Sequence, residues 1–376
     1  PGAAGGRIVF DGTPDELRAA DTLTGAYLGG RKSIGLGFAR LVKADTPRLI
    51  LEGVREHNLQ GIAVEFPLQR LVTVTGVSGS GKSTLIQDVL APALMRHFGQ
   101  STESPGAHDR LLGAEQLSGV VFVDQSPIGK TARSNPVSYV GAWDAMRKLF
   151  ADAPLARQRG YTASKFSFNS GDGRCPTCGG SGFEHVEMQF LSDVYLRCPD
   201  CDGKRFRAEL LDVKLGLKTK ELSVSDVLDL TVAEAVQLFA DQRAVVAKLQ
   251  PIVDVGLDYV TLGQPVPTLS GGEAQRLKLA GFLAEAAASP RFGVAKKGTL
   301  FLFDEPTTGL HFDDIAKLMR ALRKLLAAGH SLILIEHNLD VIRAADWLID
   351  LGPEGGDAGG RVLVAGTPET VMACAE

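Results

Sequence analysis

Short apolar runs that end in polar or charged residues recur along the chain and are typical of buried strands in a parallel sheet. Four of them lie at residues 71–75, 120–123, 300–303 and 332–335. After the first, a stretch that opens at Leu85 repeats apolar residues at helical spacing to about Phe98. Strands and helices of this kind, alternating along one chain, predict an α/β fold.

The remaining pattern predicts further elements around this framework. Strands are expected at 49–51 and 62–66, and helices in 142–170, 222–230, 232–239 and 245–255. Residues 1–17 resemble the end of a β-hairpin followed by a turn, 18–47 a Gly-containing linker with a weak helix, and 100–117 a polar segment without regular structure.

A glycine-rich loop separates the strand at 71–75 from the helix that follows. It fits the pattern Gly, four residues, Gly, Lys, then Ser or Thr, which binds phosphates. Lys82 is expected to reach the β- and γ-phosphates of a nucleotide, and the Ser83 hydroxyl to hold Mg²⁺. The expected binding residues are Gly76, Ser78, Gly79, Ser80, Gly81, Lys82, Ser83 and Thr84. A Gly/Ser turn that only precedes a helix is the alternative reading.

Polar side chains follow three of the apolar runs. Since parallel strands end at one edge of a sheet, these side chains are expected to lie together. We expect Asp304 to join Ser83 on Mg²⁺ and Glu305 to act as general base toward water. His337 is then placed to hydrogen-bond the γ-phosphate. Gln125 could reach Mg²⁺ and the attacking water, although most glutamines at such positions are simply polar surface groups.

A Ser-Gly-Gly-Glu segment precedes another helix. Exposed N–H groups, a hydroxyl and a helix N-terminus favour an anion there. The expected phosphate-contacting residues are Ser270, Gly271, Gly272 and Glu273. The alternative is an ordinary helix N-cap, in which Ser270 or Glu273 is the capping residue.

Four of the five cysteines form two Cys-x-x-Cys pairs, at Cys175 and Cys178 and at Cys198 and Cys201. This spacing predicts a Cys₄ zinc site. Four thiolates complete the tetrahedral shell, so the zinc is expected to be structural rather than catalytic. A redox dithiol is the alternative. His185 is interpreted as an ordinary strand residue.

Basic and aromatic residues surround the two cysteine pairs. Such a patch can follow a DNA backbone, or it can be the solvated rim of a small zinc module. The expected DNA contacts are Arg197, Lys204, Arg205 and Arg207. The other members of the patch are Arg174, Phe183, Phe190, Tyr195 and Phe206.

Length and composition limit the class of protein. At 376 residues, two or more domains are expected. The net charge of −4 gives no global basic field, so any DNA contact must be local. No apolar run is long enough to span a membrane, and the cysteine pairs suit a reducing compartment, so a cytoplasmic location is expected.

Two segments of the chain resemble each other at identical spacing. Residues 4–16 and 358–370 share Ala-Gly-Gly-Arg and, further on, Gly-Thr-Pro. A repeat indicates duplicated units. If the second copy closes a nucleotide-binding unit, the first copy closes an earlier one, and the chain is the C-terminal part of a tandem protein. Chance similarity between Gly-rich hairpins is the alternative.

Taken together, these motifs resemble the ABC-type ATPases, and within them the UvrA family of excinuclease proteins. The likeness covers about residues 48–370. It rests on the phosphate loop, the four-Cys module and five further motifs: Asp124-Gln-Ser-Pro-Ile-Gly, Arg133-Ser-Asn-Pro, Leu269-Ser-Gly-Gly-Glu-Ala-Gln-Arg, Asp304-Glu-Pro-Thr-Thr-Gly-Leu-His and Ile335-Glu-His-Asn-Leu-Asp.

The resemblance implies a phosphate-loop NTPase of ABC type with an inserted signature subdomain that carries the zinc module. The implied cofactors are ATP, Mg²⁺ and Zn²⁺. The implied partners are damaged double-stranded DNA, a missing N-terminal ATPase half, a second copy in a homodimer, and a UvrB-like protein that binds the absent half. The implied domains are 1–47 (end of a preceding ATPase unit and linker), 48–141 (ATP-binding core), 142–265 (helical and zinc insert), 266–352 (signature helix and remaining core) and 353–376 (hairpin and tail).

Three other functions remain open at this stage. Residues 284–298 look longer than the usual connection of the family, which would suit a paralog in drug resistance. An ATPase subunit of a membrane transporter would not need the four-Cys insert. A DNA-binding module with vestigial ATP chemistry would not need Lys82, Asp304, Glu305 and His337 together.

Overall fold

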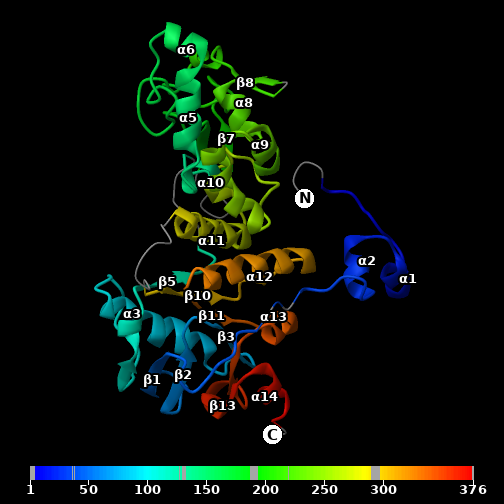
Figure 1. Cartoon of the computed structure of the whole chain (residues 1–376), viewed down its shortest axis with the longest axis vertical. Coiled ribbons are helices and arrows are strands. Elements are labelled where there is room, and N and C mark those ends of the chain that lie inside the picture. Colours follow the sequence, from blue (N-terminus) through cyan, green and yellow to red (C-terminus); the bar gives the residue numbers. More distant parts are fainter. Residues whose placement is uncertain are drawn as a thin grey trace. The chain divides into compact units, whose positions relative to one another are not determined.

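The computed structural model describes residues 5–35, 37, 39–126, 128, 133–186, 194–218, 220–288 and 297–374. The chain divides into two units. Unit 1 comprises Ser126–Ala288 with the described part of Pro1–Arg7, and unit 2 comprises Ile8–Gln125 with the described part of Ser289–Glu376. Figure 1 labels the helices and strands of both units.

A six-stranded sheet forms the centre of unit 2. Its order is β13-β12-β3-β11-β10-β5, with all neighbours parallel except the antiparallel edge pair β12 and β13. The strands are β3 (Leu71–Gly76), β5 (Gly119–Val123), β10 (Thr299–Asp304), β11 (Ser331–Ile335), β12 (Trp347–Gly352) and β13 (Arg361–Gly366). All five residues of β11 are buried, as expected for a central parallel strand. The predicted α/β framework is therefore confirmed.

Helices and a smaller sheet cover this central sheet. The helix α12 packs against β11, and its buried residues recur every three or four positions. The smaller sheet consists of the antiparallel strands β2-β1-β4, and β1 contacts the helix after the phosphate loop. The elements are β1 (Arg48–Val54), β2 (Ile62–Pro67), η2 (Thr84–Leu90), α3 (Ala91–His97), β4 (Arg110–Leu112), η3 (Ala114–Gln116), α12 (Phe312–Ala327), α13 (Leu339–Arg343), η5 (Gly356–Ala358) and α14 (Pro368–Met372). Residues 110–112 were expected to be irregular, but they pair with β1.

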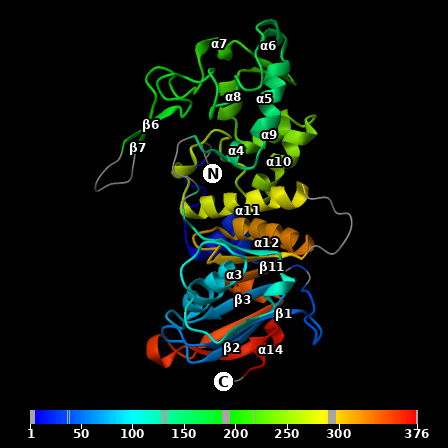
Figure 2. The same ribbon diagram turned by 90° about the vertical axis from the view of Figure 1, so that its left-hand side faces the viewer.

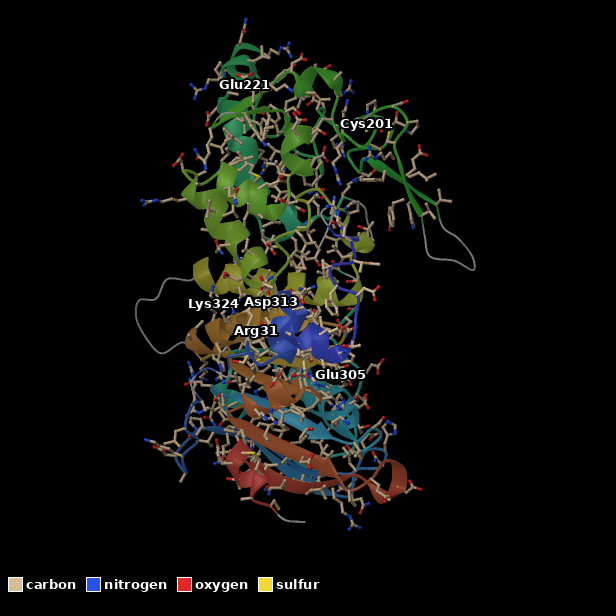
Figure 3. All side chains as sticks on the ribbon, turned by 90° about the vertical axis from the view of Figure 1, so that its right-hand side faces the viewer. Arg31, Cys201, Glu221, Glu305, Asp313 and Lys324 are labelled. Atoms are coloured by element: carbon tan, nitrogen blue, oxygen red, sulfur yellow. The ribbon has the colours of Figure 1, made fainter. Side chains whose placement is uncertain are left out.

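The beginning of unit 2 contains α1 (Pro14–Ala19) and α2 (Leu23–Leu28). Its contacts with α12 are made by α2 and by Lys32. Tyr27 stacks on Phe312 with ring centroids 5.5 Å apart, and its hydroxyl donates to Asp313, which is labelled in Figure 3. Lys32 pairs with the same carboxylate at 2.5 Å. The weak helix expected in 18–47 is therefore held by specific contacts.

The two copies of the repeat share a helix start and differ in the strand before it. Thr13 and Thr367 each cap a short helix with Pro at its first position. Residues 361–366 form β13 against β12, whereas residues 5–13 contain no strand. The hairpin expected over residues 1–17 is thus wrong for the described positions, because this stretch has no partner strand.

Unit 1 is mainly helical and carries two hairpins. Figure 2 shows the β6–β7 hairpin extending from its helices. The elements are α4 (Pro136–Tyr139), α5 (Trp143–Asp152), α6 (Pro154–Gln158), β6 (Phe183–Val186), β7 (Val194–Arg197), α7 (Ala208–Leu211), β8 (Leu215–Leu217), β9 (Lys220–Leu222), α8 (Val224–Asp229), α9 (Val232–Leu238), α10 (Arg243–Asp254), η4 (Val266–Thr268) and α11 (Gly271–Ala288). Within the described ranges, no helix combines the length and apolarity that crossing a membrane requires.

Candidate functional site

The glycine-rich loop of unit 2 follows β3 and has a backbone that only glycine fits at two positions. Gly76 has φ 138° and Gly81 has φ 104°. A Cβ on Gly76 would lie 2.1 Å from the Leu351 carbonyl oxygen, and one on Gly81 would lie 2.6 Å from Leu59. Ser83 and Thr84 then open a π-helical turn. The loop is therefore shaped by close packing as well as by backbone freedom.

Lys82 folds back over the loop. Its Nζ donates to the carbonyl oxygens of Gly76 at 2.9 Å and Val77 at 2.8 Å. Burial lowers the pKa of Lys82, while the charges of Glu305 and Asp350 act in the opposite direction. A phosphate oxygen would offer this ammonium a charged acceptor, which makes a stronger hydrogen bond than a carbonyl does.

Asn58 and residues that follow β12 hold the glycine-rich loop in place through hydrogen bonds. The Asn58 amide donates to the carbonyl oxygens of both Gly79 and Gly356 at 2.9 Å. The Gly356 N–H donates to Gly79 O, and the Gly360 N–H donates to Ser80 O. These bonds fix the loop without using the N–H groups of Lys82 or Ser83.

Asp304 ends β10 and faces the helix after the loop. Its Oδ2 accepts a hydrogen bond from Gln87 at 2.7 Å. Burial raises the pKa of Asp304, and the neighbouring charges of Glu305 and Asp124 raise it further. A divalent cation bound to this carboxylate would offset the energetic cost of keeping its negative charge buried next to other acidic residues. Gln125, one residue after Asp124, is exposed at the end of β5.

Glu305 and His337 are joined directly. Glu305 Oε1 and His337 Nε2 lie 3.1 Å apart, and Thr308 donates to Glu305 Oε2 at 3.2 Å. Glu305 is labelled in Figure 3 and has φ 42°, a left-handed conformation that is strained for a non-glycine residue. The bond from its N–H to Ile335 O holds the backbone in this state.

A buried carboxylate lies behind His337. Glu336 is 2 % exposed and accepts from the Thr307 N–H and hydroxyl and from the N–H groups of His337 and Asn338. Burial raises its pKa, and these four donors oppose the shift. The bonds tie the turn after β10 to the turn after β11, so Glu305 and His337 are positioned by one network.

The Ser-Gly-Gly-Glu segment lies in unit 1 and forms a full capping box. Glu273 Oε2 accepts from the Ser270 N–H and hydroxyl at 2.9 Å, and Ser270 Oγ accepts from the Glu273 N–H. The Tyr259 hydroxyl donates to Glu273 Oε1 at 2.5 Å; burial and this carboxylate raise the pKa of Tyr259 to about 12. The capping interpretation is confirmed, and it leaves Ser270 and Gly271 exposed at the helix start.

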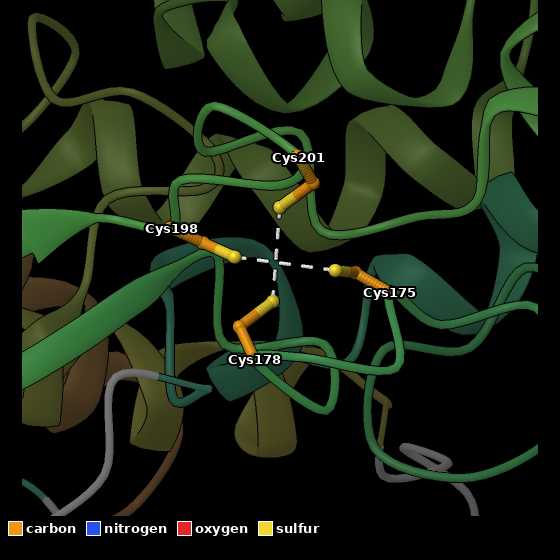
Figure 4. Close-up of side chains that lie close together, drawn as sticks. All are labelled: Cys175, Cys178, Cys198 and Cys201. Atoms are coloured by element: carbon orange, nitrogen blue, oxygen red, sulfur yellow. Dashed lines mark hydrogen bonds between the residues drawn. The ribbon is translucent and has the colours of Figure 1, made fainter.

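The four cysteines of unit 1 point toward one another, as Figure 4 shows. Their Sγ atoms all lie within 4.8 Å, with Cys175 and Cys198 4.0 Å apart and Cys178 and Cys201 3.7 Å apart. Tetrahedral zinc with bonds of about 2.3 Å places its sulfurs about 3.8 Å apart. Three of the cysteines are buried and all are unbridged, so the cluster fits this ion.

Backbone donors and glycines shape the cysteine turns. The Gly182 N–H donates to Cys178 Sγ at 3.3 Å, and the Cys175 N–H donates to Arg205 O. Burial raises the pKa of Cys201 to about 12 when no cation is bound. His185 stacks on Tyr195 across the β6–β7 hairpin, 4.9 Å between ring centroids, which agrees with a strand residue outside the cluster.

The four residues expected to contact DNA do not share one environment. Arg197, Lys204 and Arg207 are exposed, and Arg197 pairs with Asp202 at 3.7 Å. Arg205 is only 3 % exposed and donates to the Gly263 carbonyl at 2.6 Å. A buried guanidinium cannot contact the phosphate backbone of DNA. The expectation that Arg205 is a DNA contact is therefore wrong. Phe190 of that patch and residues 289–296 of the long connection lie outside the described residues.

Sequence reasoning missed Asn58, Gln87, Asp350 and Glu336. Gln87 had a usable signal, since it lies four residues after Ser83 and therefore on the same helix face. Asp350 follows an apolar strand run, as Asp304 does. Asn58 gave no signal, because its partners lie far away in the sequence or are backbone groups. Glu336 belongs to the Ile335-Glu-His-Asn-Leu-Asp motif, but the motif does not indicate that it accepts hydrogen bonds from the turn after β10.

Comparison with known proteins gives matches over the whole chain. No protein-family model matches it. The chain is 51% identical over 374 residues to the UvrABC system protein A of Thermus thermophilus and 50% identical over 376 residues to that of Mycobacterium bovis. Both alignments cover 99% of this chain but only 38% and 37% of the relatives. The chain thus spans about two-fifths of their length.

A solved structure supports the same relationship. The crystal structure of UvrA2 from Deinococcus radiodurans matches with a TM-score of 0.86 and 44% sequence identity. The match covers all of this chain and 44% of that one. The likeness therefore includes the four-Cys unit as well as the sheet with the glycine-rich loop.

Proposed function

We propose that this chain is part of a UvrA-type protein and forms an ABC-type ATPase region. In this proposal, ATP binding and hydrolysis are coupled to contact with damaged double-stranded DNA in nucleotide excision repair. One observation carries the proposal. The glycine-rich loop, Asp304 and the Glu305–His337 pair gather at one edge of the unit 2 sheet.

The glycine-rich loop is the proposed phosphate site. Backbone N–H groups of Gly76–Thr84 bind the phosphates, and Lys82 exchanges its two carbonyl acceptors for phosphate oxygens. Ser83 and Asp304 are the Mg²⁺ ligands. When bound, Mg²⁺ would neutralise phosphate charge, and the bond from Gln87 orients the Asp304 carboxylate.

Glu305 is the proposed general base, and His337 its partner at the γ-phosphate. The carboxylate would accept a proton from the attacking water, while the imidazole, held 3.1 Å away, donates to a phosphate oxygen. Gln125, exposed at the neighbouring strand end, is proposed to orient the water and Mg²⁺.

ATP is proposed to lie between two ATPase units. One unit would supply the loop and carboxylates, and the opposite unit would supply Ser270, Gly271, Gly272 and Glu273 at a helix start. The second unit would be the remaining length of a UvrA-type chain or another copy of this one. ATP then favours the paired state, and hydrolysis releases it.

This pairing makes ATP turnover depend on concentration. If two units complete each site, turnover per chain rises with chain concentration until the pairs are saturated. Steady-state phosphate release is measured over a hundredfold range of concentration, with oligomeric state followed in the same samples. Constant turnover per chain in a strictly monomeric sample would refute the shared site.

The four-Cys cluster is proposed to hold a structural zinc ion and to support a DNA-contacting surface. Arg197, Lys204 and Arg207 are the contacts offered to the DNA backbone. Because chemically different lesions share altered duplex shape, contacts to the backbone and the deformability of the site would recognise them better than base readout.

Replacing Lys204 and Arg207 together with Ala is expected to weaken duplex binding and flatten its salt dependence. Each lost phosphate contact reduces the slope of log affinity against log salt by about 0.9, so the pair reduces it by about 1.8. Fluorescence anisotropy at several salt concentrations gives the slope. Lys220→Ala with Arg243→Ala, exposed charges elsewhere in unit 1, is the matched control. An unchanged slope would exclude this surface.

A further inference from the structure

His311 is the N-cap residue of α12 and lies six residues after Glu305. Its Nδ1 accepts a hydrogen bond from the Asp313 N–H at 3.2 Å. The residues that usually cap a helix in this way are asparagine, aspartate, serine and threonine, and all of them are shorter than histidine. Because the imidazole caps with one ring nitrogen, its other nitrogen extends beyond the helix and is available for a second contact.

This second nitrogen of His311 contacts α2. His311 Nε2 lies 3.1 Å from Thr24 Oγ1, although the two residues are 287 positions apart in the sequence. In a neutral imidazole whose Nδ1 accepts a hydrogen bond, the proton is on Nε2, so His311 donates and Thr24 accepts. The ring also lies edge-on to Tyr27, with centroids 5.9 Å apart. His311 therefore connects α2 to the turn after β10.

Further contacts hold α2 beside the start of α12 (Figure 1). Tyr27 stacks on Phe312, and its hydroxyl donates to Asp313 Oδ1 at 3.2 Å. Lys32 Nζ donates to the same carboxylate oxygen and lies 5.2 Å from the centroid of the Tyr27 ring. The α2 segment, defined as Thr22–Lys32, thus contacts the first turn of α12 through a hydrogen bond, an ion pair and aromatic packing.

The chain between Glu305 and His311 forms a turn that is closed by its own hydrogen bonds. The Leu310 N–H donates to Thr307 O at 3.0 Å, and the Thr308 N–H donates to Glu305 O at 3.1 Å. The Thr308 hydroxyl also donates to the Glu305 carboxylate. Since hydrogen-bonded networks of this kind carry energetic coupling, a displacement of His311 changes the position of the carboxylate.

We propose that His311 is a positioning residue of the ATPase site and that the α2 segment, through Thr24 and Tyr27, holds it in place. The segment then sets the orientation of Glu305 toward the attacking water, and it acts through the turn rather than on the nucleotide. Loss of the contact lowers ATP turnover without changing nucleotide affinity. This inference rests on the proposed role of Glu305 as general base.

The test uses two variants of the full chain that break the same contact from opposite sides. His311→Asn keeps a capping side chain on α12 but is too short to reach Thr24. Thr24→Val removes the acceptor hydroxyl and leaves His311 unchanged. Leu28→Ala, at an exposed position of α2, is the control, because alanine is compatible with the helix. The readouts are kcat and KM for ATP hydrolysis, binding of a fluorescent ATP analogue, and hydrogen exchange of the amides in 305–311.

Each single variant is expected to lower kcat about threefold to tenfold and to speed exchange of the amides in 305–311. KM and the affinity for the analogue are expected to stay within about twofold of wild type, because the phosphate site is untouched. Since both substitutions remove one contact, the double variant is expected to be no slower than the slower single variant. The control is expected to behave as wild type.

Wild-type kcat in both single variants would overturn the positioning role. A loss of kcat in His311→Asn that Thr24→Val does not share would overturn the link to α2, as would multiplied losses in the double variant. An equal loss of analogue affinity would assign both residues a merely structural role. Failure of the proposed function would appear differently, as a wild-type chain that hydrolyses no ATP or as unchanged turnover in Glu305→Gln.

Discussion

Replacing Glu305 with Gln is expected to lower ATP turnover by about 10²- to 10⁴-fold while ATP still binds. The amide keeps the size of the side chain and its contacts with His337 and Thr308 but cannot take a proton from water. Since Lys82, Ser83 and Asp304 are untouched, nucleotide affinity is expected to stay within a few-fold of wild type.

Phosphate release and binding of a fluorescent ATP analogue separate the two effects. Glu103→Gln, an exposed residue of unit 2 before β4, is the matched control and is expected to behave as wild type. If Glu305→Gln hydrolysed ATP within threefold of the wild-type rate, Glu305 would not be the base. A parallel loss of ATP binding would assign it a structural role instead.

Replacing Cys175 and Cys198 with Ser is expected to abolish zinc binding and unfold the surrounding module. These two thiols are almost fully buried, at 2 % and 0 % exposed, and their Sγ atoms are 4.0 Å apart. Structural zinc contributes about 10–16 kcal/mol to the folding of small metal-dependent domains at neutral pH. The metal content should fall from about one ion per chain to nearly none.

Cys374→Ser is the control for this experiment, because it removes an exposed thiol outside the cluster. Metal analysis gives the stoichiometry, and hydrogen exchange over residues 173–186 and 194–207 reports the fold of the module. A double variant that retained one zinc ion, or a Cys374 variant that lost it, would contradict the assignment of these ligands.

The framework of the fold could be predicted because its signals are local. Each apolar run of β3, β5, β10 and β11 is contiguous, and the glycine-rich loop contains its own turn chemistry. Because parallel strands end at one edge of a sheet, the consecutive residues Asp304 and Glu305 lie near His337. The spacing of the two Cys-x-x-Cys pairs is likewise a local signal, and it predicted that the four cysteine sulfurs would lie together.

Features set by distant partners could not be predicted. Asn58 fastens a loop through Gly356, almost three hundred positions away in the sequence. No sequence pattern distinguishes Arg205 from the exposed basic residues near it. Its burial depends on residues that include Phe168, Phe183 and Gly263. Residues 110–112 form a strand because they pair with β1, which is a distant segment of the sequence. Residues 5–13 pair with no strand of the described chain.

The proposed function requires ATP binding to change the affinity of the chain for DNA, and one binding measurement tests this most directly. The affinity of the Glu305→Gln chain for a damaged duplex is measured with and without ATP and Mg²⁺, with Lys82→Ala as the variant that cannot hold the nucleotide. We predict a change in DNA affinity of at least about fivefold with ATP, matched by an equal change in ATP affinity with DNA, and no change in Lys82→Ala. An affinity for DNA that is the same with and without ATP, or an ATP effect that persists in Lys82→Ala, would contradict the account.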